Sequence, residues 1–105
     1  MTNILYKLNN LIASRDGTNP ETSWTDKLLS EGVERCAKKF GEEAVELIIA
    51  AASENKNDIE KETADVIYHL LVLLRATDVS FDDVLKILED REKESGISEK
   101  LSRQK

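Results

Sequence analysis

The sequence predicts an all-α protein, and three observations lead to that fold class. Apolar residues recur at three- and four-residue intervals along most of the chain. No stretch alternates apolar and polar residues with a period of two, as a half-buried strand would. Four glycines and one proline in 105 residues act as breaks between helical stretches. We therefore expect a bundle of four main helices in one domain over residues 1–105, with a core at about 3–94 and a flexible tail at about 95–105.

The first helix is expected at about residues 3–14, where leucines and isoleucines follow a helical period. The segment RDGTNPETS then predicts a loop, because Pro20 disfavours helical geometry at Asn19. Ser23 or Thr25 can cap the helix that follows, since a hydroxyl side chain accepts from the free N–H groups of a first turn. The loop is thus predicted to join two helices.

A long second helix is expected to continue to about Ala52, with Gly32 separating a short initial piece at about residues 25–30 from the rest. The polar segment SENKND ends this helix. The third helix is expected at about residues 58–76, which are rich in Ile, Val and Leu. Two long helices joined by a short polar loop are expected to pack antiparallel.

Caps are predicted for the last two helices. Asn57 or Asp58 can cap the third helix. Ser80 and Asp83 resemble a capping box at the start of the fourth helix, which is expected to extend to about Lys93. These caps would satisfy N–H groups that have no partner inside the helix.

Acidic residues of the second helix lie beside its expected core stripe rather than opposite it. With Glu42 at 0° and about 100° per residue, Glu46 falls at about 40° and Glu43 at about 100°. Arg35 and Lys39 fall in the same sector, at about 20° and 60°. The core stripe covers about 120–220° and comprises Val33, Cys36, Phe40, Ala44 and Leu47.

The third helix carries a similar line, with Glu62, Asp65 and His69 beside its apolar stripe. Antiparallel packing can bring the two acidic lines together. Five crowded carboxylates repel one another by several kcal/mol when partly desolvated. Hard oxygen ligands suit Mg²⁺ or Mn²⁺, and Mg²⁺ shares its coordination with substrate phosphates. The pattern favours a magnesium site for a phosphorylated ligand, and the competing interpretation is a solvated face with surface ion pairs.

Longer motifs extend this interpretation. GEEAVE followed by ETAD is similar to the EExxE and ExxD signature of the MazG-like all-α NTP pyrophosphatase fold. The segments SWTDKLLSEGVERCAKKFGEEAVELIIAA, ETADVIYHLLVLL and FDDVLKILEDR resemble the phosphoribosyl-ATP pyrophosphatase family of histidine biosynthesis. The resemblance covers about residues 5–91, which is most of the chain.

The resemblance implies a dimeric helical fold and Mg²⁺-dependent hydrolysis of phosphoribosyl-ATP to phosphoribosyl-AMP and pyrophosphate, with Mn²⁺ as a substitute metal. By motif, the metal-binding residues are Glu42, Glu43, Glu46, Glu62 and Asp65. Glu43 or Glu46 is the candidate catalytic base for attack of water at the α-phosphorus. The candidates for substrate binding are Lys27, Arg35, Lys38, Lys39 and His69.

Two other functions fit the same motifs. One is a house-cleaning pyrophosphatase of the same superfamily that acts on dUTP or other NTPs. The other is a non-catalytic helical interaction module whose acids form only a solvated face. The segments YHLL and KLLSEG carry the resemblance that separates the first two activities, and a panel of substrates would decide between them. Metal titration distinguishes an enzyme from an interaction module.

Composition limits the partners and the location. The net charge of −6 argues against general nucleic-acid binding, the apolar runs are too short for a membrane span, and the N-terminus lacks a signal-peptide pattern. Cys36 is the single cysteine and fits a reducing cytoplasm. We expect a cytoplasmic protein with a small-molecule substrate. We also expect a homodimer, because the third helix has apolar residues on more than one side. These residues are Val66, Ile67, Leu71 and Leu73.

Overall fold

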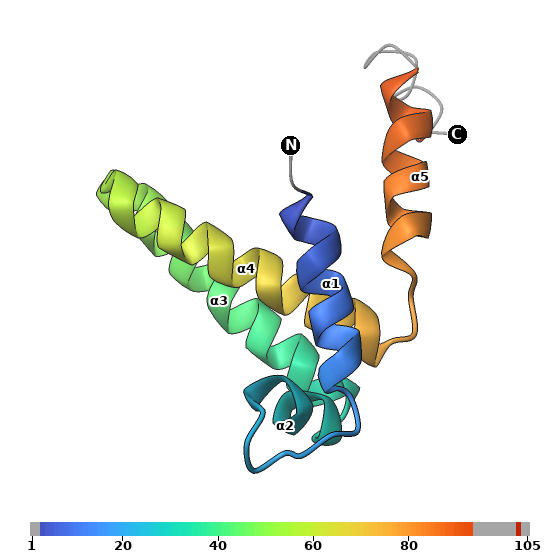
Figure 1. The fold of residues 1–105 in the computed structure, drawn as a ribbon. Helices are drawn as coiled ribbons and strands as arrows, with labels where there is room; N and C mark the ends of the chain where they lie inside the picture. Colours follow the sequence, from blue (N-terminus) through green and yellow to red (C-terminus); the bar gives the residue numbers. More distant parts are fainter. Residues whose placement is uncertain (1–2, 94–102, 104–105) are drawn as a thin grey trace.

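A computed structural model of the chain describes residues 3–93 and residue 103. These residues form only helices and connecting loops, so the predicted all-α class is confirmed (Figure 1). The predicted tail at 95–105 lies outside the described residues, apart from Arg103. The helices are α1 (Ile4–Arg15), α2 (Trp24–Ser30), α3 (Val33–Ser53), α4 (Lys56–Ala76) and α5 (Phe81–Glu92).

The predicted count of four main helices is not confirmed, because the described residues form five. Gly32 makes α2 a separate element from α3, since its φ of 96° is a backbone conformation that favours glycine. The α2 helix occupies the place of the short initial piece predicted before Gly32. The bounds of the other helices agree with the predicted bounds to within two residues.

Side-chain caps begin three of the helices. Ser23 caps α2 as predicted, since its Oγ accepts from the N–H of Asp26 at 3.1 Å. The predicted cap of α4 at Asn57 or Asp58 is wrong. Asn55 caps it instead, because Glu54 ends α3 in the left-handed conformation, at φ 61°, and leaves only a two-residue connection.

The remaining caps differ from one another. The Asn3 side chain accepts from the N–H of Tyr6 and begins α1. Ser80 precedes α5 at the predicted position, but its side chain makes no capping hydrogen bond. The predicted capping box with Asp83 is therefore wrong, although the helix boundary is right.

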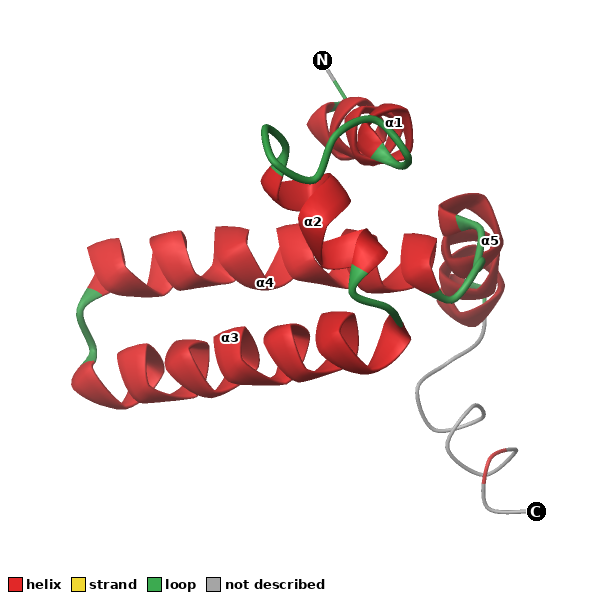
Figure 2. Cartoon of the chain, turned by 90° about the horizontal axis from the view of Figure 1, so that it is seen from below, coloured by secondary structure: helices red, strands yellow, loops and turns green. Residues whose placement is uncertain are grey.

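The two longest helices, α3 and α4, pack antiparallel as predicted and run side by side along their length (Figure 2). The core lies toward one end of this hairpin, where α1 and α2 meet it. Its fully buried side chains are Ile12, Leu28, Cys36, Leu71 and Val72. Cys36 is a packing residue, as its place in the predicted stripe indicates.

Val33 does not belong to the core, contrary to the predicted stripe. It is 46% exposed, because it is the first residue of α3 and lies at the turn that follows α2. The predicted stripe further along the helix is closer to the observed burial, since Phe40, Ala44 and Leu47 are all half-buried.

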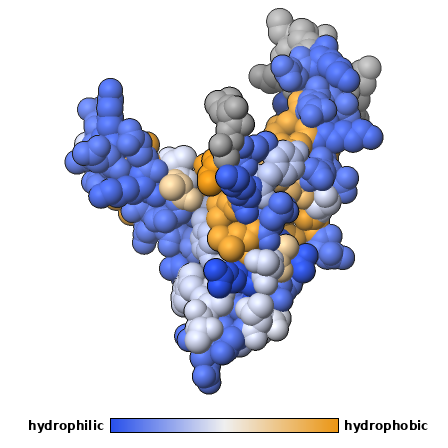
Figure 3. All heavy atoms as spheres, viewed as in Figure 1, coloured by the Kyte–Doolittle hydropathy of each residue, from blue (hydrophilic) through white to orange (hydrophobic). Residues whose placement is uncertain are grey.

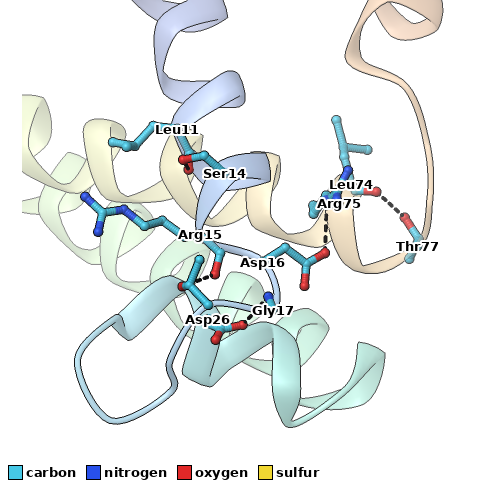
Figure 4. A network of polar contacts seen from close by, with 10 residues as sticks. Leu11, Ser14, Arg15, Asp16, Gly17, Asp26, Leu74, Arg75 and Thr77 are labelled. Atoms are coloured by element: carbon cyan, nitrogen blue, oxygen red, sulfur yellow. Dashed lines mark hydrogen bonds and ion pairs between the residues drawn. The ribbon is translucent and has the colours of Figure 1, made fainter.

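Polar contacts between residues distant in sequence fix the α1–α2 loop (Figure 4). Arg75 near the end of α4 donates from Nε to Asp16 Oδ2 at 2.9 Å. The N–H of Gly17 donates to the buried carboxylate of Asp26 at 2.8 Å. These contacts hold the start of the loop against α4 and α2.

The α5 helix extends away from the rest of the chain (Figure 1). Its first residue, Phe81, makes an edge-to-face contact with Tyr6 of α1, with ring centroids 5.6 Å apart. Two large apolar side chains of α5, Ile87 and Leu88, are more than half exposed. The contacts within one chain therefore leave much of this helix uncovered.

None of the described helices is long and apolar enough to cross a membrane.

Candidate metal centre and active site

The antiparallel α3–α4 hairpin brings two acidic segments face to face. Glu43 projects from α3, while Glu62 and Asp65 project from α4 one turn apart. One carboxylate oxygen from each of these three residues lies within 4.8 Å of the others. We call this set the carboxylate triad. The predicted meeting of acids from the two helices is thus found in the structure.

The carboxylate triad has a graded exposure. Glu43 is buried, Glu62 is half-buried and Asp65 is exposed. The Oε2 atom of Glu62 is buried without a hydrogen-bond partner among the described residues. An unpartnered buried carboxylate oxygen carries a desolvation cost that a bound cation would offset. The triad therefore fits a hard divalent cation such as Mg²⁺ or Mn²⁺, which prefers carboxylate oxygen.

Glu46 lies beside the triad. A hydrogen bond with Glu43 and the negative charge of Glu43 raise the pKa of the Glu46 carboxyl, and the charge of Glu62 adds to the effect. These causes place the carboxyl next to two triad members. Glu42 lies further out, since its half-exposed side chain contacts Lys39 at 3.7 Å and it is not part of the triad.

Two basic side chains approach Glu43. Lys39 Nζ lies 3.2 Å from Glu43 Oε1, and His69 Nε2 lies 4.0 Å from the same oxygen. His69 is buried, and this burial lowers its pKa. The charge of Lys39 lowers that pKa further, whereas Glu43 and Asp65 oppose the shift. The predicted candidates Lys39 and His69 are thus both brought to the triad.

The other three basic candidates lie elsewhere. Arg35 lies about two turns before the acids of α3 and pairs with Glu31, at the end of α2, at 3.2 Å. Lys38 is exposed and forms no ion pair with an acid among the described residues. Lys27 belongs to α2, where its ammonium lies 5.8 Å from the centre of the Trp24 ring. Within one chain, the structure does not bring these three to the triad.

Tyr68 ties the site to α2. Its hydroxyl shares a hydrogen bond with Thr25 Oγ1, and its ring makes an edge-to-face contact with His69 at 4.9 Å. Tyr68 of α4 thus contacts α2. Its partner Thr25 was not identified, because nothing in the sequence links two residues that lie 43 positions apart.

Asp26 was also missed. It stands three residues after Ser23, a spacing that is typical of a helix cap. This spacing does not predict which group the Asp26 carboxylate contacts. Its carboxylate instead reaches back to the N–H of Gly17 across the loop. This contact positions α2 and does not belong to the triad.

Helical architecture and a triad of facing carboxylates define the class as an all-α protein with a site suited to a divalent cation. Comparison with known proteins identifies the family. The model of the family described as "Phosphoribosyl-ATP pyrophosphohydrolase" matches residues 5–92. The chain belongs to this family, so the resemblance inferred from its motifs is confirmed.

Full-length relatives agree with this family. The phosphoribosyl-ATP pyrophosphatase of Ruegeria sp. (strain TM1040) is 54% identical over 102 residues, which cover 97% of each chain. That of Dinoroseobacter shibae is 55% identical over 100 residues, covering 95% of this chain and 98% of the relative. That of Paracoccus denitrificans is 54% identical over 99 residues, covering 94% and 92%.

Proposed function

We propose that this protein hydrolyses phosphoribosyl-ATP to phosphoribosyl-AMP and pyrophosphate, the second step of L-histidine biosynthesis. The observation that carries this function is the family match over residues 5–92, together with relatives named phosphoribosyl-ATP pyrophosphatase that align over nearly their full length. The protein is then a hydrolase of amino-acid biosynthesis that acts on a phosphoanhydride bond. We further propose that it works as one domain in the cytoplasm.

The carboxylate triad is the proposed metal centre, with Glu42 and Glu46 at its edge. Its oxygen ligands support Mg²⁺ as the cofactor and Mn²⁺ as a substitute. When bound, Mg²⁺ would neutralise the negative charge of the polyphosphate and lower the pKa of a bound water molecule. The convergent oxygens of Glu43, Glu62 and Asp65 would hold the ion.

Glu46 is the proposed general base. In the reaction, a water oxygen bonds to the α-phosphorus, the bond from that phosphorus to the bridging oxygen breaks, and pyrophosphate leaves. A base must take the proton of the water. Glu46 is exposed beside the triad, where water and substrate can reach it. Glu43, the alternative base, is buried and already shares Oε1 with Lys39 and His69.

Lys39 is the proposed partner of a substrate phosphate, because its ammonium is the one nearest the triad among the described residues. His69 is proposed to hold Glu43 in place from the opposite helix. Lys27, Arg35 and Lys38 remain candidates for parts of the substrate that extend beyond the triad.

Turnover measurements test the proposed function. Phosphoribosyl-ATP should be hydrolysed far faster than dUTP or ATP, and only with Mg²⁺ or Mn²⁺ present. Preferred turnover of dUTP would favour a house-cleaning pyrophosphatase. If no nucleotide is hydrolysed and melting is indifferent to millimolar Mg²⁺, the interaction module is favoured.

A metal that binds only the folded state at about a hundredfold excess over its Kd should stabilise the protein by about 2.7 kcal/mol.

We also propose that two copies form a homodimer. Three of the four residues predicted to supply the apolar surplus do not do so, because Leu71 is buried in the core and Ile67 and Leu73 pack against it. The fourth, Val66, is half-buried. The uncovered apolar surface lies elsewhere. Ile48 and Ile49 of α3 are 66% and 62% exposed. Figure 3 adds a hydrophobic area between α1 and α5.

Large apolar side chains that are exposed in one chain support association between copies, which would cover them. Light scattering at micromolar concentration should give twice the mass of one chain. Replacing Ile48 by Glu should shift this mass to that of a monomer, because a charge would be buried in the interface. A monomer for the unsubstituted protein would contradict the proposed dimer.

A further inference from the structure

Lys39 occupies an unusual position for a lysine of a surface helix. Its ammonium lies 3.2 Å from Glu43 and 3.7 Å from Glu42, one turn or less along α3. Its side chain is about three-quarters covered, with 24% of its surface exposed. Among the described residues, no other lysine or arginine pairs with an acid of the triad within 4.0 Å. Lys39 is therefore the resident cation of this acidic site.

The same carboxylate serves Lys39 and the proposed metal. Glu43 Oε1 pairs with the ammonium, and Glu43 is also a member of the carboxylate triad. A divalent cation in the triad and an ammonium on Glu43 repel each other at short range, in a site partly shielded from water. Binding of the metal therefore weakens the Lys39–Glu43 pair. The flexible four-carbon stem of lysine lets the ammonium move to another anion.

We propose that Lys39 is an exchangeable counter-ion, which neutralises Glu43 in the metal-free protein and is displaced toward a substrate phosphate when a divalent cation binds. The inference rests on the proposed function, since it takes the triad as the metal centre. The inference adds an order of binding, in which the metal binds before the substrate phosphate. The metal both binds phosphate and frees the ammonium that binds phosphate next, so cation and polyphosphate bind cooperatively.

Mn²⁺ titration of the full chain, stripped of metal with EDTA, tests the exchange without any turnover. Removing the resident cation in Lys39→Met should tighten Mn²⁺ binding by more than about twofold and up to about fivefold, because a partly exposed ion pair contributes at most about that factor. Lys39→Arg keeps the charge and should stay within about twofold of the unsubstituted protein. Lys61→Met is the matched control, since it removes an exposed lysine adjacent to Glu62 and should also stay within about twofold.

A second titration measures the other half of the exchange. With Mn²⁺ at saturating excess, Lys39→Met should bind manganese pyrophosphate at least about fivefold more weakly, because the displaced ammonium is missing. A purely structural lysine would not tighten the metal and weaken the phosphate together. Unchanged or weaker Mn²⁺ binding in Lys39→Met would overturn the exchange and leave the metal centre standing. Absence of Mn²⁺ binding in the unsubstituted protein would overturn both.

Discussion

The α3–α4 hairpin and the α1–α2 loop are held in place by different kinds of contact. The hairpin consists of two 21-residue helices joined by Glu54 and Asn55, and its acids face each other because the helices pack antiparallel. The loop is fixed by polar contacts to residues far away in sequence, such as Asp16 with Arg75. Acids in the hairpin crowd one another, whereas Asp16 and Asp26, at the two ends of the loop, each accept a hydrogen bond.

This difference separates activity from stability. A carboxylate that repels its neighbours contributes little to folding and is free to bind a cation. A carboxylate with a buried donor contributes to folding and has no capacity left for a ligand. Substitutions in the two regions should therefore change different measurements.

The largest effect on folding is expected where the two regions meet. Leu28 of α2 is fully buried among α1, α3 and α4, so Leu28→Ala should lower the free energy of unfolding by about 2–5 kcal/mol. Leu28→Met nearly conserves volume and should cost less than about 1.5 kcal/mol. Urea denaturation measures both. Equal stabilities for the two variants would show that Leu28 does not fill the core.

The largest effect on activity is expected in the hairpin. Glu43→Gln and Asp65→Asn each remove the charge of a proposed metal ligand and should lower kcat/KM at least about a hundredfold, or about 2.7 kcal/mol. Asp65→Asn should change the free energy of unfolding by less than about 0.5 kcal/mol, because the side chain is exposed. Steady-state turnover of phosphoribosyl-ATP measures the loss.

Glu89→Gln on α5 is the control for these variants, since it removes the same charge from an exposed helix outside the triad. It should be nearly silent in both assays. If Glu43→Gln and Asp65→Asn turn over phosphoribosyl-ATP as fast as Glu89→Gln does, the triad is not the metal centre.

An intermediate effect on folding is expected where the α1–α2 loop contacts α2. Asp26→Ala removes the buried acceptor of the Gly17 N–H and should cost about 1.5–3 kcal/mol, the range for a hydrogen bond to a charged group. Glu21→Ala changes an exposed acid of the same loop and should stay within about 0.5 kcal/mol. Thermal melting compares the two. A silent Asp26→Ala would mean that the loop is held by its other contacts.

The smallest effect is expected for the ion pair at the end of α4. Asp16 and Arg75 are both well exposed, so Arg75→Gln should cost less than about 1 kcal/mol. Salt screens exposed pairs, and the difference from the unsubstituted protein should shrink in 1 M NaCl. Melting curves at low and high salt provide the measurement. A cost that persists in high salt would indicate packing of the arginine stem instead.

The sequence by itself determined the elements, the hairpin and its acidic faces. Helical period places Glu62 and Asp65 on one side of α4, and a short connection forces α3 and α4 to pack antiparallel. Both are local rules, which need no knowledge of distant residues. The motifs that resemble the family are also read directly from the sequence, and the family match confirms that resemblance.

Only the tertiary structure decided which charged residues meet. Helical spacing grouped Arg35 with Lys39, yet Arg35 pairs with Glu31 at the end of α2, whereas Lys39 pairs with Glu43 within α3. The partner of Asp26 and the cap of α4 likewise depended on where the backbone turns. Side-chain partners are set by distances of a few ångströms across elements, and residue spacing along one helix does not contain those distances.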